Sequence, residues 1–280
     1  MTRTPESQPS DTSGQAGREP YVHGYRKESF RGRRASTHAG FFLPYLKPGM
    51  SLLDCGCGPG AITLDLAEAV SPGQVVGIDN QERQVDTARG HAAERGSSNV
   101  RFQVASIYEL PFEATSFDAV FIHAVLEHLS EPLKALIEVH RVLRVGGIVG
   151  IRHGDWDGML STPSRAILKR GMDLYERAWK EGGGDPRFGK HQKRLLREAG
   201  FSRIQASASY ECADTPEAIR LWTEPFVGRL TKSTFVERVL EEGWADKKTL
   251  QEMAAAFQDI WQHPDAFLSM AWCEAVGWKE

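Results

Sequence analysis

The chain has 280 residues, of which 41% are hydrophobic and 25% charged, and its formal net charge is −3. This length and apolar content suffice for one globular unit with a sizeable core. A nearly balanced charge creates no field that would gather polyanions, so we expect no nucleic-acid partner. No apolar run approaches the ~20 residues that span a bilayer, and no secretory signal opens the chain, so we expect a cytoplasmic protein with no membrane partner.

The cysteines give no sign of disulfides or of a metal. Cys55 and Cys57 lie too close together in the sequence to pair easily, and Cys212 and Cys273 are isolated. No second pair of ligands accompanies the Cys-x-Cys segment, as a zinc site would require. We therefore expect reduced thiols and no metal.

The N-terminal residues change character twice. Residues 1–20 are rich in Ser, Thr, Pro, Gly and Gln and contain almost no large apolar side chains, which predicts a disordered tail. Residues 21–48 are basic and aromatic, and they predict a helical segment that ends near Pro44 and Pro48. The basic run from Arg26 to Arg34 either folds over an anionic group of a ligand or forms a solvated helical face.

Residues 49–157 alternate between short apolar runs and stretches of helical periodicity. The expected strands are residues 51–54, 74–79, 100–104, 117–122 and 147–151, and the first expected helix is residues 61–69. Strands joined by helices form a mostly parallel sheet covered on both faces, because each crossover is right-handed. The pattern predicts a doubly wound α/β core.

Regular alternation stops after residue 157. Residues 158–196 predict an insertion with helices near 162–180 and 190–199, and residues 197–211 then predict a core strand. Residues 212–265 have helical periodicity and predict a second insertion. Residues 266–280 alternate with a period of two, as a last strand returning to the sheet would.

The segment Leu-Leu-Asp-Cys-Gly-Cys-Gly-Pro-Gly at residues 52–60 leads from a buried strand through a turn into a helix. Its glycines allow the backbone to approach a ligand closely, although alone they also fit NAD, FAD or tight packing. About 20 residues later, Asp79 ends the next strand, where a carboxylate can accept hydrogen bonds from both hydroxyls of a ribose. Together the two features favour a nucleoside ligand.

Further motifs follow in order: Leu-Pro-Phe at 110–112, Ser-Phe-Asp-Ala-Val at 116–120, Val-Leu-Glu-His-Leu at 125–129, and residues 138–147. With the glycine loop and Asp79, they closely resemble the class I methyltransferases that depend on S-adenosylmethionine (SAM), in particular the ubiquinone/menaquinone-biosynthesis-type small-molecule enzymes. The resemblance covers roughly residues 50–155 and extends weakly to 197–201. It implies a Rossmann-like, doubly wound, mostly parallel seven-stranded sheet with a helical cap formed by the insertions, SAM as cofactor, and residues 21–48 covering that cofactor.

Carried over by position, the resemblance places three glycines at the amino-acid end of SAM, Asp79 at the ribose and Asn80 beside the adenine. The loop after the third strand carries Ser106 and Ile107 where the family usually has an Asp for the adenine amine, so that contact is weaker here. Val145 replaces the family's usual proline before two glycines and alters only the turn. The residues thus assigned to SAM are Asp54, Gly56, Gly58, Gly60, Asp79, Asn80, Ser106, Ile107 and His123.

Methyl transfer from a sulfonium is a direct displacement, which alignment and exclusion of water can promote. A hydroxyl or carbon acceptor would also need a general base, and the candidates are His123, His153 and Asp155, with Asp157 as a further one. The segment from His153 to Asp157 is expected to leave the fifth strand as a loop on the acceptor side, or to be merely a polar loop. His123 is alternatively a capping or core histidine, and its spacing to Glu127 is structural in this family rather than a metal pair.

Aromatic side chains in the insertions, including Trp179, Trp222, Phe226 and Phe235, are consistent with a cap over a small apolar or aromatic acceptor, or simply with a core. An NAD-dependent oxidoreductase is an alternative, but it would require the Gly-x-Gly-x-x-Gly spacing that this loop lacks. An RNA or protein acceptor and a SAM-binding protein without turnover are further alternatives. We expect a monomer or a homodimer.

Overall fold

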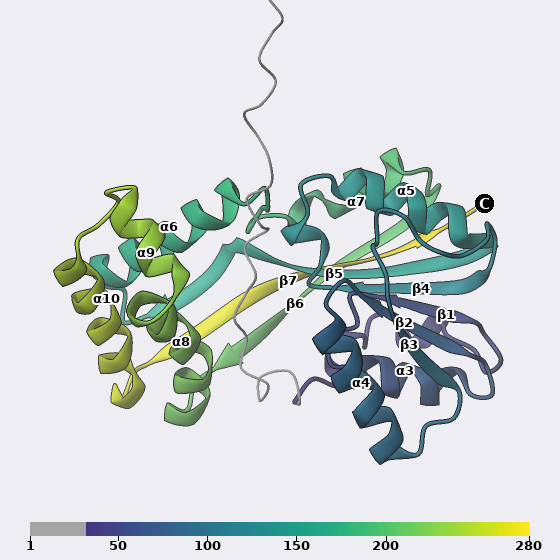
Figure 1. Ribbon diagram of the computed structural model, residues 1–280, viewed down its shortest axis with the longest axis horizontal. Coiled ribbons are helices and arrows are strands. Elements are labelled where there is room, and N and C mark those ends of the chain that lie inside the picture. Colours follow the sequence, from purple (N-terminus) through teal and green to yellow (C-terminus); the bar gives the residue numbers. More distant parts are fainter. Residues whose placement is uncertain (1–31) are drawn as a thin grey trace, which may run out of the picture.

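The computed structural model of the protein describes residues 32–280. It consists of an α/β core and a helical cap, joined by three long strands that run through both parts (Figure 1). The disordered tail predicted for residues 1–20 and most of the basic run from Arg26 lie outside the described residues.

The core is a seven-stranded sheet with the order β3-β2-β1-β4-β5-β7-β6. β1 to β5 are parallel, and β7 is antiparallel to both of its neighbours. The strand order reverses between β1 and β4, which is where open α/β sheets bind ligands. The predicted doubly wound, mostly parallel seven-stranded sheet is confirmed. Its strands are β1 Leu52–Cys55, β2 Val75–Asp79, β3 Val100–Val104, β4 Phe117–His123, β5 Leu143–Thr162, β6 Arg203–Ala213 and β7 Phe267–Trp278.

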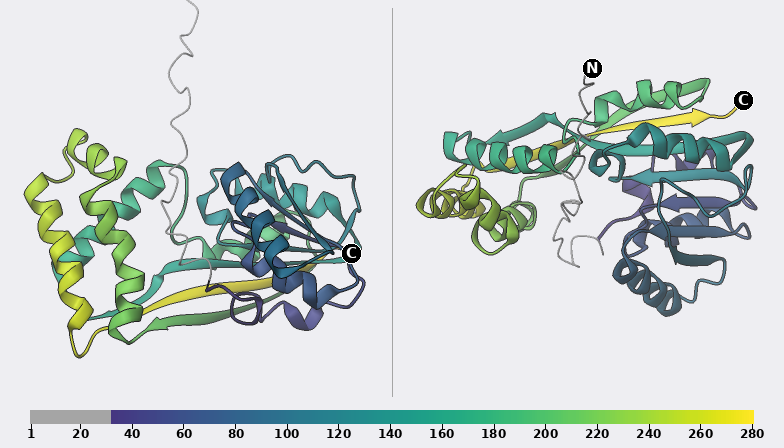
Figure 2. Two further views of the ribbon diagram at one scale, coloured as in Figure 1. Left: turned by 60° about the horizontal axis from the view of Figure 1, so that its bottom comes forward. Right: turned by 45° about the horizontal axis from the view of Figure 1, so that its top comes forward.

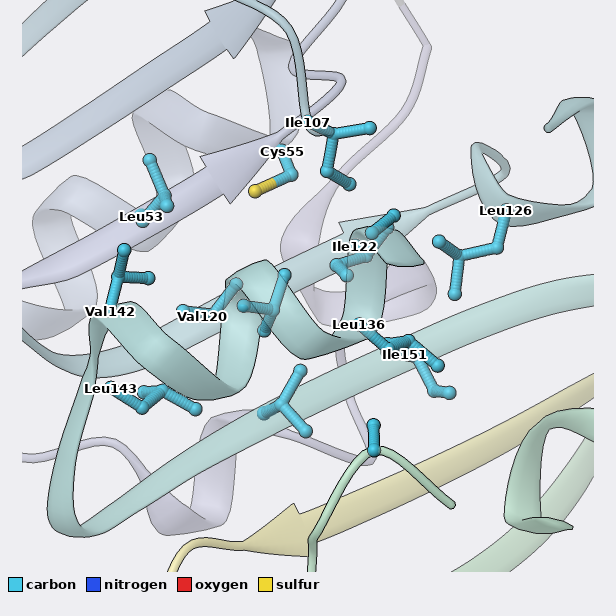
Figure 3. Close-up of a cluster of buried hydrophobic side chains, with 14 of the residues drawn as sticks. Leu53, Cys55, Ile107, Val120, Ile122, Leu126, Leu136, Val142, Leu143 and Ile151 are labelled. Atoms are coloured by element: carbon cyan, nitrogen blue, oxygen red, sulfur yellow. The ribbon is translucent and has the colours of Figure 1, made fainter. Parts of the chain in front are cut away.

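Helices cover both faces of the sheet. α3 (Ala61–Val70) and α4 (Glu82–Arg95) lie on one face, and α5 (Pro132–Val142) and α7 (Gln192–Glu198) lie on the other (Figure 1). The short α2 (Ala35–His38) shares a buried cluster with α3. α5 buries Ala135, Leu136, Val139 and Val142 against β1, β4 and β5 (Figure 3). This apolar face repeats at helical spacing, which is why the sequence forms a helix here.

The fifth strand is much longer than predicted. The expectation that residues 153–157 leave the strand as a loop is wrong, because β5 continues to Thr162. β7 pairs with this part of β5, with a register shift between Asp155 and Leu160. The backbone N–H and C=O groups of β5 therefore find hydrogen-bond partners on β7, a strand that the local sequence does not reveal. Residues 158–162 are therefore strand rather than the start of the helical insertion.

The cap consists of α6 (Ala166–Glu181), α8 (Pro216–Thr231), α9 (Thr234–Glu241) and α10 (Lys247–Asp259). These helices share their own apolar core. α8, α9 and α10 stand at the far end of the long strands from the α/β core, whereas α6 runs from the cap back toward that core (Figure 2). Between residues 32 and 48 the expected helical segment consists of α2 and the short 3-10 turn η1 (Leu43–Tyr45). Within residues 32–280, no helix is both long and apolar enough to cross a membrane.

Candidate active site

A cavity of about 540 Å³ lies at the carboxyl ends of the parallel strands, at the point where the strand order reverses. Its size falls within the range of small-molecule sites. The expected SAM residues that line it are Asp54, Gly56, Gly58, Asp79, Asn80, Ser106, Ile107 and His123.

The three glycines of the loop have different surroundings. A Cβ on Gly56 would lie 2.2 Å from the Val125 side chain, so this glycine permits close packing of the loop on the segment after β4. A Cβ on Gly60 would lie 2.9 Å from both Ala88 and Phe102, and Gly60 does not line the cavity. Gly58 has a positive φ of 52° and nothing within 4 Å of the position of its Cβ. Gly58 therefore offers bare backbone to the cavity, as close contact with a ligand requires.

Asp79 stands fixed at the end of β2. Its two carboxylate oxygens accept hydrogen bonds from the backbone N–H groups of Gly58 (3.0 Å) and Gln81 (2.9 Å). Burial raises the pKa of Asp79, while these N–H groups oppose the rise. Since each oxygen can accept more than one hydrogen bond, the held carboxylate retains capacity for two ribose hydroxyls.

Asp54 joins the first strand to the first core helix. Its carboxylate accepts a hydrogen bond from the Thr63 hydroxyl at 2.6 Å, which fixes the start of α3 under the glycine loop. Burial raises the pKa of Asp54 to about 7. Asp54 thus positions the loop and also lines the cavity.

The loop after β3 forms the adenine end of the expected site. The Ser106 hydroxyl accepts a hydrogen bond from the backbone N–H of Tyr108 (3.2 Å), so part of its hydrogen-bonding capacity goes to shaping this loop. Tyr108, Gln81 and Gln84 also line the cavity, and the sequence interpretation did not include them. No motif marks these residues, because the family resemblance assigns only the neighbouring positions.

His123 lies at the opposite wall of the cavity, at the end of β4. Its Nδ1 lies 3.2 Å from the carbonyl oxygen of Arg152, and its Nε2 has no hydrogen-bond partner among the described residues. Burial, with the nearby charges of Arg33 and Arg152, holds the pKa of His123 well below its usual value. A carbonyl can only accept, so Nδ1 carries the proton and the neutral ring keeps a bare lone pair on Nε2.

Two of the other candidate bases, His153 and Asp155, lie elsewhere. Successive side chains of a strand point to opposite faces, so His153 and Asp155 project to the face opposite Arg152 and do not line the cavity. His153 Nε2 accepts from the backbone N–H of Leu126 (3.1 Å), and burial lowers the pKa of His153 to about 3. Asp155 accepts from the backbone N–H of Lys190 (2.9 Å). Both side chains thus hold the polypeptide together, and the structure brings neither to His123.

Glu127 and His128 connect the core to the cap. The Trp179 indole N–H of α6 donates to the Glu127 carbonyl (3.1 Å), and the His128 ring stacks on that indole at 4.7 Å. Burial raises the pKa of Glu127 to about 8 and lowers the pKa of His128 to about 4. His128 lines the cavity, so α6 reaches the cavity wall through it. In the described part of the chain, no three His, Cys, Asp or Glu residues are grouped as a metal site would need.

Comparison with known proteins points to one family. A family model described as a methyltransferase domain matches residues 46–200, a span that contains β1 to β5 and the helices α6 and α7. An uncharacterized methyltransferase of Schizosaccharomyces pombe is 29% identical over 246 residues, which cover 85% of this chain and 87% of that protein. A demethylmenaquinone methyltransferase of Lactococcus lactis is 37% identical over 129 residues, or 45% of this chain and 48% of that enzyme.

Among solved structures, the [4+2]-cyclase SpnF is similar to this chain with a TM-score of 0.52 and 25% sequence identity. The match covers 84% of this chain and 77% of the cyclase. A protein named for a cyclisation therefore shares this architecture, so the fold alone does not specify which reaction takes place in the cavity.

Proposed function

Because the chain belongs to the methyltransferase-domain family, we propose that its cavity aligns SAM with a small-molecule acceptor and that His123 removes the acceptor's proton. The observation that carries the proposal is the junction of Asp79 with the glycine loop. The Asp79 carboxylate is held by the Gly58 N–H at the edge of a cavity that also contains the unpartnered Nε2 of His123.

The residues at this site fit SAM, the cofactor of the family. Gly58 leaves space for a ligand against the backbone, and the fixed Asp79 carboxylate suits a ribose. On this proposal Gly56 and Gly58 hold the amino-acid end, while Asn80 and the loop at Ser106 hold the adenine. SAM supplies an electrophilic methyl group on a sulfonium. The sulfur leaves as a neutral thioether, so the leaving group needs no proton.

His123 is the catalytic base in this proposal. Arg152 fixes the imidazole through its carbonyl oxygen, so that Nε2 receives the proton that the acceptor loses as its new bond to the methyl carbon forms. The low pKa of His123 keeps the base unprotonated at neutral pH. His123 thus acts on an acceptor that is already acidic, such as a phenolic or enolic hydroxyl or an activated carbon, because a weak base removes only an acidic proton.

The cap completes the acceptor side. His128, stacked on Trp179, and Gly182 at the end of α6 line the cavity next to the core residues, and they limit the entry of water. The cavity volume of about 540 Å³ suits small molecules. The cytoplasmic location, the lack of a nucleic-acid partner and the monomeric or dimeric state stay predictions.

Calorimetric titration tests the cofactor assignment directly. SAM and its demethylated product, S-adenosylhomocysteine, should both bind with micromolar affinity, and NAD, the cofactor of the oxidoreductase alternative, should not. Binding of NAD alone would contradict the proposal. A second candidate, a SAM-binding protein without methyl transfer, is favoured by the likeness to the cyclase. It would be supported if SAM binds but a panel of phenols and enols incubated with methyl-labelled SAM gains no label.

A further inference from the structure

A group of buried polar atoms without partners lies behind the His123 wall of the cavity. Among the described residues, His123 Nε2, Arg152 Nη1 and Trp272 Nε1 all lack a hydrogen-bond partner. Trp272 contacts both of the other side chains: the Arg152 guanidinium lies 4.3 Å from the centre of the Trp272 ring, and the His123 and Trp272 ring centres are 5.1 Å apart. A buried donor or acceptor without a partner costs free energy, so three at one place indicate a ligand or bound water.

The side chains share one face of the sheet although they are distant in sequence. Arg152 pairs with Glu274 across β5 and β7, and Gly154 pairs with Trp272 two residues further along the same ladder. His123 pairs with Arg152 across β4 and β5. Since residues two apart on a strand face the same side, His123, Arg152 and Trp272 project from three neighbouring strands toward the same region.

The charge of Arg152 is already balanced. Its guanidinium donates to Glu211 (2.9 Å) and Glu274 (3.4 Å), and Arg152 is only 1% exposed. A further full negative charge at this site would lie close to two carboxylates in a buried environment, which is unfavourable. The unpartnered N–H groups therefore suit an uncharged oxygen, such as a carbonyl, rather than a carboxylate or phosphate.

We propose that the methyl acceptor carries a carbonyl group, whose oxygen accepts hydrogen bonds from Arg152 Nη1 and Trp272 Nε1 while its acidic hydroxyl or carbon faces His123 Nε2. This inference rests on the proposed function and adds the substrate class to it. The acceptor's proton passes to Nε2, the new bond forms to the methyl carbon, and the electron pair of the broken carbon–sulfur bond remains on sulfur. Because all three atoms are covered, a ligand reaches them only after a side chain moves at the His123 wall.

The carbonyl also explains how a weak base suffices. A carbonyl conjugated with the reacting group lowers its pKa, and two donors on the carbonyl oxygen stabilise the charge that spreads there as the proton leaves. His123 and the two donors thus act on opposite ends of one conjugated system. Arg152 and Trp272 are specificity-determining residues on this reading, and His123 remains the base.

The test compares matched probes in the presence of saturating S-adenosylhomocysteine. The pairs are acetyl- and ethyl-substituted phenols, both ortho and para, so that each pair differs only in a carbonyl conjugated with the hydroxyl. Calorimetry should give at least one pair in which the protein binds the member with the additional carbonyl about tenfold more tightly. Trp272→Phe, which removes the N–H but keeps a ring against Arg152, should bring that ratio close to one.

The chain provides a matched control. Trp244 Nε1 is also buried and without a described partner, and its ring lies under the Arg177 guanidinium at 4.1 Å in the cap. Trp244→Phe should leave the carbonyl preference unchanged. Arg152→Lys, which keeps the charge but removes Nη1, provides a second variant if Trp272→Phe does not fold.

Each outcome decides the proposal. Absence of any carbonyl preference in the parent protein, including failure of every probe to bind, would mean that water alone satisfies these atoms and would overturn it. A preference that survives in the folded Trp272→Phe or Arg152→Lys variant, or that Trp244→Phe abolishes equally, would also overturn it. If the parent protein does not bind S-adenosylhomocysteine at all, that result would instead contradict the proposed function.

Discussion

Replacement of Asp79 by alanine should weaken SAM binding severely. The carboxylate lies at the cavity edge with both oxygens held by backbone N–H groups, at 3.0 and 2.9 Å, so its position is set before a ligand arrives. Two hydrogen bonds from ribose hydroxyls to a charged acceptor contribute roughly 1.5–3 kcal/mol each. Their loss corresponds to an increase in Kd of about 100- to 20,000-fold.

Calorimetric titration of parent and variant with SAM measures this change. Asp86→Ala is a suitable control, because Asp86 lies on α4 with an exposed side chain that pairs only with the exposed Arg89 among the described residues. Its affinity for SAM should equal that of the parent. A thermal melt should show that Asp79→Ala remains folded. An affinity within threefold of the parent in a folded Asp79→Ala protein would refute the assignment of Asp79 to the ribose.

Three further predictions concern the base, the core and a buried carboxyl. His123→Asn can keep a donor to the Arg152 carbonyl but removes Nε2, so kcat should fall about 100-fold or more while the affinity for SAM is retained. His263→Asn in the cap should change neither kcat nor SAM affinity. Equal kcat values in the two variants would exclude His123 as the base. Leu136→Ala should lower the free energy of unfolding by about 2–5 kcal/mol in denaturant titrations, and the same truncation of the 51%-exposed neighbour Ile137 by far less; similar losses would contradict the packing of α5. Burial raises the pKa of Glu127 from 4.5 to about 8, so between these pH values the folded protein retains a proton that the unfolded chain loses, and the free energy of unfolding should decline as the pH rises. Glu127→Gln should remove about 1 kcal/mol per pH unit of that slope. Parallel profiles of unfolding free energy against pH for parent and variant would show that Glu127 is ionised in the folded protein.

The elements that local sequence determines were predicted well. β1 to β4 occur within a residue or two of the expected positions, because each is a short apolar run between turn residues. The glycine loop and Asp79 are adjacent through a single crossover, so their junction follows from the motif itself. The extension of β5 to Thr162 could not be read in this way, because the segment Gly-Asp-Trp-Asp-Gly becomes a strand only by pairing with β7, more than 100 residues later in the chain.

That missed extension also limited the prediction of the site. Once residues 152–155 are known to be strand, alternation places Arg152 on the face of His123 and sends His153 and Asp155 to the other face. A loop carries no such alternation, so the sequence offered His153 and Asp155 as candidate bases with no reason to prefer either. The contact of Arg152 with Trp272 depends on the same long-range pairing and had no local signal.

The long ladder of β5, β6 and β7 also determines how the cap can move. Many two-part enzymes open by swinging about a pair of flexible linkers, but here the backbone hydrogen bonds continue from the core to the Thr162–Phe267 and Ala213–Leu268 pairs beneath the cap. The three paired strands therefore form a stiff connection between core and cap rather than a hinge. The pairing is interrupted only on the β5 side, at the register shift after Asp155. Rotation of the cap through a large angle would require hydrogen bonds between β5, β6 and β7 to break. Substrate entry and product release must instead depend on movement of elements that lie outside these three strands.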